Sequence, residues 1–328
     1  MIDRRTLIGC GLIAAAWPAQ ARPAARWEPR ADAPWLVQEV YGAAFRGQVV
    51  IAGGMAPSDA SLRKLNPLDR TGLYDPAADR WREGPRLPFA RHHPALAATR
   101  DRVYAFGGYR VTDEGDWVAI RDTLAFDGEA WTAAPEMPRF QGETVAVTLG
   151  DCIHLAGGRA PIGAANRRWT DQGDVDTHQV FDLKAARWSL AAPCPAARNS
   201  AAGAVIGGKF YLAGGRTVRG GNSARLDRYD PQSDRWETLR PMPKPAGGLA
   251  GAAVGGKLYV FGGETPREVI AECWCYDPAR DRWTAGPPMR SPRHGLAGVA
   301  VKGRIYAVGG GLKPSGGEVC AINEVLLG

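Results

Sequence analysis

The sequence predicts an all-β protein that forms a closed ring of six repeated units, each made of four antiparallel strands. Six short apolar runs each end in a glycine doublet, and a tryptophan stands 26 residues before the first glycine of every doublet. The repeats follow one another at intervals of 47 to 57 residues, a period typical of propellers and solenoids. The six pairs in register are Trp27/Gly53, Trp81/Gly107, Trp131/Gly157, Trp188/Gly214, Trp236/Gly262 and Trp283/Gly309.

Each strand of a repeat has its own pattern. The first strand is rich in small residues, as in Ala201–Val205, which suits a position at a crowded axis. The second ends in the glycine doublet, where the backbone must approach another backbone or adopt a positive φ. An octet Tyr-Asp-Pro-x-x-Asp-Arg-Trp predicts a hairpin between the third and fourth strands, because Asp-Pro starts a turn. It occurs at Tyr74–Trp81, Tyr229–Trp236 and Tyr276–Trp283.

The amino-terminal segment around Trp27 is predicted to close the ring. The last repeat ends at Gly328, 19 residues after Gly309, and carries no tryptophan of its own. Trp27 is the one tryptophan in register without a doublet before it. We therefore expect its strand to be the outer strand of the sixth unit, which removes the open edges.

These patterns match the kelch motif, in which a glycine doublet follows an apolar strand and a tyrosine or phenylalanine and a tryptophan follow at set distances. The chain resembles bacterial exported kelch proteins over nearly all of residues 24–328. The resemblance implies a six-bladed kelch β-propeller, which we expect to occupy residues 22–328 as one domain. It implies little about function.

Residues 1–21 are predicted to be an export signal. Arg4 and Arg5 precede an apolar stretch from Leu7 to Trp17, and Ala19-Gln20-Ala21 offers a cleavage site. The arginine pair resembles a twin-arginine signal, although a general secretory signal fits nearly as well. We expect a periplasmic or secreted protein of bacterial origin, with no transmembrane segment in the mature chain. A lipoprotein box that ends at Cys10 is a weaker alternative.

Composition excludes several classes of function. The formal net charge of +7 falls to +6 without residues 1–21 and is spread along the chain, so we expect no nucleic-acid partner. Five irregularly spaced cysteines remain, which indicates neither a disulfide framework nor a zinc site. The acidic cluster of Asp171, Asp174 and Asp176 matches no calcium loop. We expect no metal, no cofactor and a monomeric chain.

The candidate ligand site lies where the first strands begin and the second strands end, because in an antiparallel unit these points share one face. Arginines, histidines and a few glutamates gather there, a set that suits a small anionic or polyhydroxylated ligand. The segments concerned also include Glu39. The predicted ligand contacts among them are Arg91, His93, Arg110, Glu143, Arg159, Arg198, Asn199, Arg216 and Arg293.

Two alternatives stay open at this stage. Arg91, Arg198 and Arg293 recur at one position of the repeat, so they are either ligand contacts or framework residues bonded to backbone carbonyls. Trp117 and Trp169 lie in insertions on the same face. An indole there either stacks on a sugar ring or packs against a neighbouring loop. We include both tryptophans among the predicted ligand contacts.

Two classes of function follow. The first is a binding module for a small anionic or carbohydrate ligand or for a protein partner. The second is an enzyme: the chain is distantly similar to sialic acid mutarotase, and this resemblance implies a functional pair at Glu264 and Arg267. Mutarotation needs one group that accepts the anomeric proton and one that protonates the ring oxygen. Glu264, with His92 or His294 opposite, is the predicted catalytic set. Galactose oxidase also uses a kelch propeller, but its copper ligands find no match here.

Overall fold

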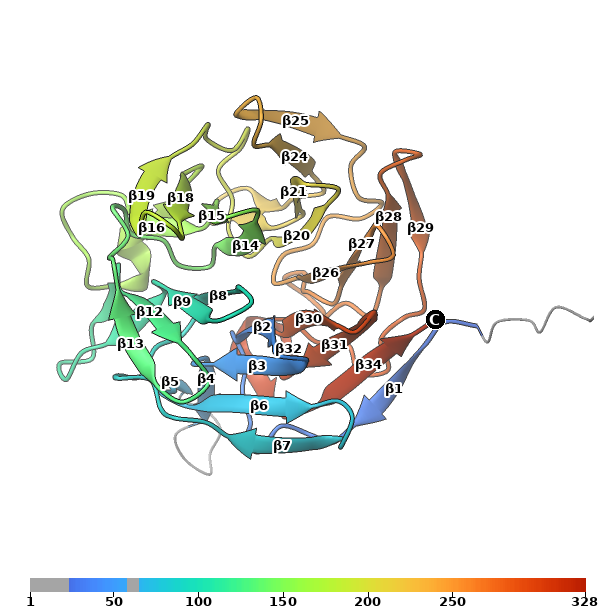
Figure 1. Cartoon of the computed structure of the whole chain (residues 1–328), viewed down its shortest axis with the longest axis horizontal. Helices are drawn as coiled ribbons and strands as arrows, with labels where there is room; N and C mark the ends of the chain where they lie inside the picture. The colour runs from blue at the N-terminus through green and yellow to red at the C-terminus, as the bar shows by residue number, and fades with distance from the viewer. Residues whose placement is uncertain (1–23, 58–64) are drawn as a thin grey trace, which may run out of the picture.

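The computed structural model describes residues 24–57 and 65–328. In this part of the chain, six four-stranded antiparallel sheets are arranged as blades around a central axis, which confirms the predicted propeller (Figure 1). The predicted export signal lies outside the described residues. Within the two described ranges, we find no helix with the length and apolar character that a bilayer span requires.

The strands of each blade are named a to d from the axis outward. Blade 1 contains β2 (Tyr41–Phe45), β3 (Gln48–Ala52), β6 (Thr71–Asp75) and β7 (Arg80–Glu83). Blade 2 contains β8 (Ala95–Ala98), β9 (Val103–Phe106), β12 (Thr123–Phe126) and β13 (Trp131–Ala134). Blade 3 contains β14 (Val145–Leu149), β15 (Cys152–Ala156), β18 (His178–Asp182) and β19 (Arg187–Leu190).

The second half of the ring repeats this order. Blade 4 contains β20 (Ala202–Ile206), β21 (Lys209–Ala213), β24 (Leu226–Asp230) and β25 (Arg235–Leu239). Blade 5 contains β26 (Ala250–Val254), β27 (Lys257–Phe261), β28 (Cys273–Asp277) and β29 (Arg282–Ala285). Blade 6 contains β30 (Ala297–Val301), β31 (Arg304–Val308), β34 (Asn323–Leu327) and β1 (Arg26–Arg30).

The ring closes as the sequence predicts. Strand β1 pairs antiparallel with β34, and Trp27 lies opposite Leu326 in that register. The Trp27 side chain is only 3% exposed, and its ring packs 5.1 Å from that of Phe261 in blade 5. Its indole nitrogen donates a hydrogen bond to the Pro287 carbonyl at 3.0 Å. The amino-terminal strand therefore seals blade 6 and also contacts its neighbour.

The glycine doublets join each blade to the next. The Gly263 amide donates to the Arg293 carbonyl at 3.0 Å, across the boundary between blades 5 and 6. Gly262 has a φ of +64°, and a Cβ there would lie 2.6 Å from the same carbonyl oxygen. Only glycine fits such an approach. The expected contact of backbone with backbone is confirmed.

The outer aromatic residues form hydrogen bonds within a blade and between neighbouring blades. The Trp236 indole donates to the Ala192 carbonyl of the preceding blade at 2.8 Å. The octet forms the hairpin between strands c and d, and in blade 4 the Tyr229 hydroxyl donates to Asp234 at 2.8 Å. Each blade is thus tied to its neighbour at the axis by glycine and at the rim by tryptophan.

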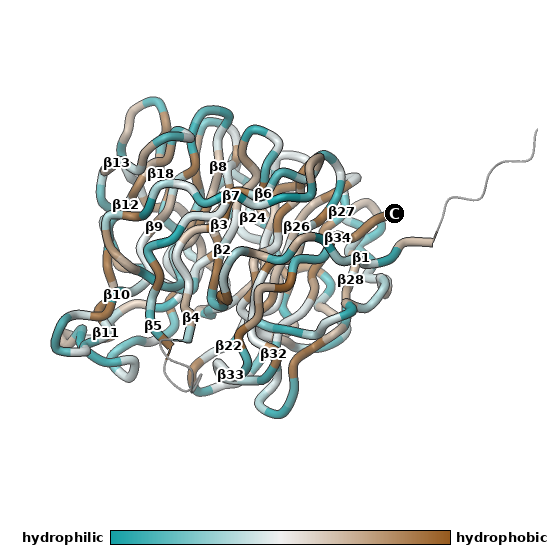
Figure 2. The backbone as a smooth tube through the Cα atoms, turned by 90° about the horizontal axis from the view of Figure 1, so that it is seen from below, coloured by the Kyte–Doolittle hydropathy of each residue, from teal (hydrophilic) through white to brown (hydrophobic). Residues whose placement is uncertain are grey.

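Among the described residues, five of the six connections between strands b and c form short hairpins that extend from one face of the ring (Figure 2). The sequence indicates only loops there. The additional strand pairing orders these connections into β-structure on this face. The hairpins are β4–β5 (Met55–Pro57, Leu65–Pro67), β10–β11 (Tyr109–Val111, Trp117–Ala119), β16–β17 (Arg159–Pro161, Gln172–Asp174), β22–β23 (Arg216–Thr217, Gly221–Asn222) and β32–β33 (Gly311–Lys313, Gly317–Val319). Short 3₁₀ turns η1 (Trp169–Asp171) and η2 (Pro314–Gly316) lie within two of them.

Candidate functional site

A cavity of about 760 Å³ opens on the hairpin face, over the end of the axis. We call it the mouth cavity. Blades from all round the ring contribute polar side chains to it, and two tryptophans add aromatic surface. Its principal residues are Glu39, His93, Trp117, Arg159, Trp169, Asn199, Arg216, Glu264 and His294.

The backbone places these residues in a repeated way. Three residues precede each strand a, and the middle one pairs with the residue that follows the glycine doublet of the same blade, as Asn199 pairs with Arg216. This confirms that the two segments meet at one face. The third residue has a positive φ, for example 48° at Glu39 and 53° at Glu143. Because that conformation is costly for residues other than glycine, surrounding contacts must hold it.

Part of that support comes from hydrogen bonds between the third residues of neighbouring blades. The Ser200 amide donates to the Glu143 carbonyl, the Gly248 amide to Ser200 and the Gly295 amide to Gly248, each at 3.0 Å. We call this chain of bonds around the axis the belt. The His93 amide likewise donates to the Glu39 carbonyl at 3.3 Å, and these two third residues line the floor of the mouth cavity.

The floor contains a buried ion pair. His93 Nε2 lies 2.9 Å from a carboxylate oxygen of Glu39. Burial opposes ionisation of both groups, but their mutual attraction outweighs it. The pKa of His93 is therefore raised, mainly by Glu39. The pKa of Glu39 is lowered far below its ordinary value by His93, with smaller effects of His294 and Arg216. Glu39 is therefore ionised near neutral pH, and its carboxylate favours the protonated form of His93.

Arg216 and Glu264 form a second ion pair on one wall of the cavity. Burial opposes the charge of Arg216, yet Glu143, Glu39 and Glu264 together raise its pKa. The other oxygen of Glu264 accepts a hydrogen bond from the Ser315 amide at 2.9 Å. The carboxylate of Glu264 is therefore held from two sides and faces the cavity in a fixed orientation.

His294 stands between two carboxylates. Its Nδ1 lies 3.5 Å from Glu264 and 3.6 Å from Glu39, while Nε2 is 3.1 Å from the Lys313 carbonyl. The residue is 1% exposed, although it lines the cavity. An imidazole next to a carboxylate is able to pass a proton to or from a bound hydroxyl.

Aromatic rings form the opposite wall. Trp169 and Trp117 meet edge to face with centroids 5.4 Å apart. The Arg159 guanidinium lies 3.7 Å above the Trp169 ring, and it also donates to the Trp169 carbonyl at 3.1 Å. Trp169 remains 36% exposed. An apolar face on one side and polar groups on the other suit a ring-shaped ligand with hydroxyl groups.

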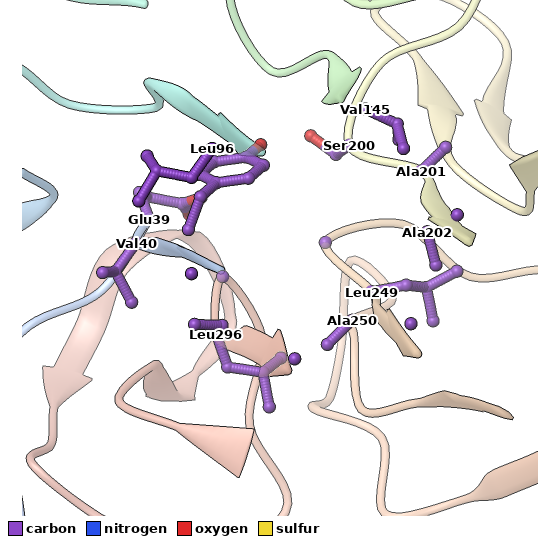
Figure 3. Close-up of a pocket in the computed structure, with 18 of the residues that line it drawn as sticks. Glu39, Val40, Leu96, Val145, Ser200, Ala201, Ala202, Leu249, Ala250 and Leu296 are labelled. Atoms are coloured by element: carbon purple, nitrogen blue, oxygen red, sulfur yellow. The ribbon is translucent and has the colours of Figure 1, made fainter. Parts of the chain in front are cut away.

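Below the mouth cavity, the axis itself is narrow. Figure 3 shows the residues of this channel, among them Leu96, Val145, Ser200 and Leu296, around a volume of about 90 Å³. Glu39 lines both spaces. The small residues of strands a thus leave little room at the centre, and a ligand of the mouth cavity is held above it.

Three predicted ligand contacts lie inside the blades instead. Arg293 donates to Glu324 at 2.9 Å and to the Ala307 carbonyl at 2.8 Å, and Arg198 donates to Asp227 at 2.7 Å. Arg91 is equally buried. Arg198 and Arg293 pair with strands of their own blade, and Arg91 donates to the Gly107 carbonyl at 3.4 Å, so the framework interpretation describes their positions.

Other predicted residues also lie off the cavity. His92 is fully buried, with its Nδ1 2.7 Å from that of His93, which leaves it behind the floor. Glu143 lies beneath the surface, where it accepts from Ser200 Oγ at 2.8 Å. Arg110 is exposed at a separate hollow, and Arg267 is exposed on the turn after Glu264. Arg267 therefore does not join Glu264 at the cavity.

The predicted residues that do meet at the cavity are His93, Trp117, Arg159, Trp169, Asn199, Arg216, Glu264 and His294. Gln38, Glu39 and Ser315 also line it but were not among the predicted contacts. Glu39 could have been found, since it occupies the same third position as His93 and Glu143. Asp174 accepts a hydrogen bond from Asn199 at 2.5 Å. In the described part of the chain, no group of His, Cys, Asp and Glu has an arrangement that would hold a metal ion.

Proteins similar to this chain in sequence include two Kelch-like proteins and Beta-scruin. Kelch-like protein terF of Aspergillus terreus is 29% identical over 55% of this chain and 39% of that protein. Human Kelch-like protein 23 is 26% identical over 63% of this chain and 33% of its own length, and Beta-scruin of Limulus polyphemus is 31% identical over 57% and 20%. The chain thus matches 39% or less of the length of these relatives.

The solved structure of YjhT has the same fold. It superposes with a TM-score of 0.74 over 90% of this chain and 96% of that chain, at 15% sequence identity. Residues 137–311, more than half of the sequence, match the model of the KLHDC2/KLHL20/DRC7 Kelch-repeats domain. With the six blades and their glycine and tryptophan contacts, this match shows that the chain belongs to the kelch-repeat family.

Proposed function

We propose that this kelch propeller binds a carbohydrate in the mouth cavity. One observation carries the proposal: a wall of exposed indole faces a wall of fixed polar groups across a volume of about 760 Å³. The apolar faces of sugar rings pack on aromatic side chains, while their hydroxyls bond to carboxylates, guanidinium groups and imidazoles. Trp169 supplies the first kind of surface, and Glu264 and His294 supply the second.

The test is calorimetry with a panel of monosaccharides on the wild type and on Trp169→Ala. Because Trp169 is partly exposed, its loss is expected to leave the fold intact and to weaken binding on the order of 10-fold. Leu190→Ala, which removes an exposed apolar side chain away from the cavity, is the matched control. Equal affinities in the wild type and Trp169→Ala would exclude this cavity as the carbohydrate-binding site.

A carbohydrate isomerase is the second candidate, favoured by the 3.5 Å approach of His294 to Glu264. These two groups can exchange protons with an anomeric hydroxyl and a ring oxygen. Anomeric exchange of a bound sugar, followed by NMR, tests this. The enzyme would lose its rate acceleration in Glu264→Gln, whereas a binding protein would show no acceleration in either form.

We also propose that the protein is exported, with residues 1–21 as its signal. The supporting observation is the order of Arg4 and Arg5, an apolar stretch and a small-residue cleavage site. Fractionation of cells that produce the full chain tests the proposal, with Arg4→Lys/Arg5→Lys as the variant. Loss of export in this variant would support the twin-arginine route, and a protein that stays in the cytoplasm in both forms would contradict export.

A further inference from the structure

We infer that the sugar bound in the mouth cavity is uncharged, a neutral hexose unit rather than a sugar acid. The inference rests on the proposed function and narrows its ligand class. It starts from the charges that the sequence places at this face, where arginines and histidines predominate. The structure shows what these cations contact.

Each cation at the base of the cavity already has a carboxylate partner. His93 pairs with Glu39 at 2.9 Å, and Arg216 pairs with Glu264. Arg159 lies 3.5 Å from Glu143, which Arg216 also approaches at 4.0 Å. Three cations thus face three carboxylates, all of them from third positions or from residues that follow the doublets. The positive charge expected from the sequence is neutralised within the site.

Both terminal nitrogens of the Arg159 guanidinium are also engaged, whereas its Nε has no partner among the described residues. Arg159 donates to the carbonyls of Trp169 and Gln172 at 3.1 and 2.9 Å, and its charged face covers the Trp169 ring. Arg216 Nε is 3.4 Å from Asn199 Oδ1. A ligand carboxylate would have to displace one of these buried partners, and a carboxylate left without its cation is strongly destabilising.

Acceptors, in contrast, remain available. Gln38 Oε1 is buried at the cavity and has no hydrogen-bond partner among the described residues. The carboxylates of Glu39 and Glu264 also face this side, next to His294. A ligand that binds this surface must therefore donate hydrogen bonds to it. Sugar hydroxyls donate hydrogen bonds, whereas an ionised carboxyl group cannot.

Two further arginines stand at the rim. Arg167 pairs with Asp116 at 2.6 Å, and its side chain is mostly exposed. Arg168 is exposed as well. Charges in that position are screened by water and ions, so they contribute little to the choice between a neutral and an anionic sugar.

The experiment compares matched sugars by calorimetry on the wild-type chain: glucose with glucuronic acid, galactose with galacturonic acid and mannose with mannuronic acid. Within the pair that binds, the hexose is expected to bind roughly 10-fold more tightly or better, because the acid brings an uncompensated charge. A uronic acid that binds as tightly as its hexose, or more tightly, overturns the inference. If only the acids bind, the proposed function stands and the inference fails; if no sugar binds, both fail.

Glu264→Gln tests the cause. The variant frees Arg216 from its partner, so the preference for hexose over uronic acid is expected to fall by about 10-fold. Glu268→Gln changes an exposed glutamate on the same turn and should leave the ratio unchanged. A ratio that stays the same in a folded Glu264→Gln protein contradicts the pairing argument. Should that variant unfold, Glu143→Gln, which leaves Arg159 without its carboxylate partner, provides the same comparison.

Discussion

The three-residue segments that lead into the inner strands carry two kinds of polar residue. At the first position, Arg198 and Arg293 turn into the blade and pair with acidic residues of strand c. At the third position, Glu39 and His93 line the mouth cavity, and Glu143 is buried next to Arg159. The two positions are only two residues apart, yet one belongs to the framework and the other to the mouth cavity and its floor.

Their partners explain the difference. Asp227 and Glu324 occupy the second residue of strand c in the same blade as their arginines, and blade 3 has an uncharged equivalent in Gln141 and Gln179, 2.6 Å apart. Framework pairs are thus complete within one repeat. Most ion pairs at the mouth cavity, in contrast, join different blades, as Glu39 and His93 do, whereas Arg159 pairs with Glu143 of its own blade. The framework pairs therefore act within one blade, whereas the mouth cavity takes its residues from several blades.

The largest effect is expected from breaking a framework pair. Arg293→Met leaves Glu324 buried without its partner and should lower the free energy of unfolding by about 3–5 kcal/mol, measured by urea denaturation. Adding Glu324→Leu, which copies Leu124 at the equivalent position of blade 2, should restore most of that loss. Arg91 has no ion pair in the described part of the chain, so Arg91→Met should cost less. Equal losses in Arg91→Met and Arg293→Met would contradict the account.

A buried histidine pair in blade 3 should give the next largest effect. His154 Nδ1 lies 2.9 Å from His178 Nε2, and burial lowers the pKa of each to about 4. The unfolded chain binds protons near pH 6.5 and the folded chain does not, so stability is full above that pH and falls as the pH drops toward 4. The loss is on the order of 3 kcal/mol for each histidine.

Denaturation curves between pH 7 and 4 measure this loss. The repeat offers matched replacements, since Tyr211 and Leu226 occupy the equivalent positions in blade 4. The double variant His154→Tyr/His178→Leu should lose most of the acid sensitivity. If its stability falls with pH as steeply as that of the wild type, other groups are responsible.

The smallest effect is expected at the floor of the mouth cavity. Glu39→Gln removes the charge that raises the pKa of His93, so burial is expected to lower that pKa below its value in the wild type. NMR titration measures it directly, because the chain has only five histidines. His178, which lies in another region, is the internal control and should not change. An unaltered His93 titration would mean that Glu39 does not set its charge.

The repeat register made the fold predictable. Fixed spacing from tryptophan to glycine reports contacts that recur in every blade, such as the bond from Gly263 to Arg293. The same register gave the positions of His93, Arg216 and Glu264 at one face. These features depend on backbone geometry, which every repeat shares.

The composition of the site was less predictable. The direction of each side chain depends on the positive φ of the third position, which the sequence does not reveal at Glu39 or Glu143. Pairing between blades, as between Arg216 and Glu264, depends on side chains of different repeats and turns an apparent excess of cations into a balanced set. The same limit applies to Arg267. It follows Glu264 by only three residues in the sequence, yet it lies on an exposed turn and does not reach the mouth cavity.

The seam between β1 and β34 has a consequence for how the chain folds. It pairs Arg26 with Leu327, so nearly the whole polypeptide separates the two partners. Contacts over such separations form slowly, because the entropy of joining distant segments must be overcome first. During synthesis from the amino terminus, β1 has to wait until its partner strand has left the ribosome. Pairing of β1 with β34 is therefore expected to be a late step of folding. Until it occurs, the open edge of blade 6 can pair with strands of other chains.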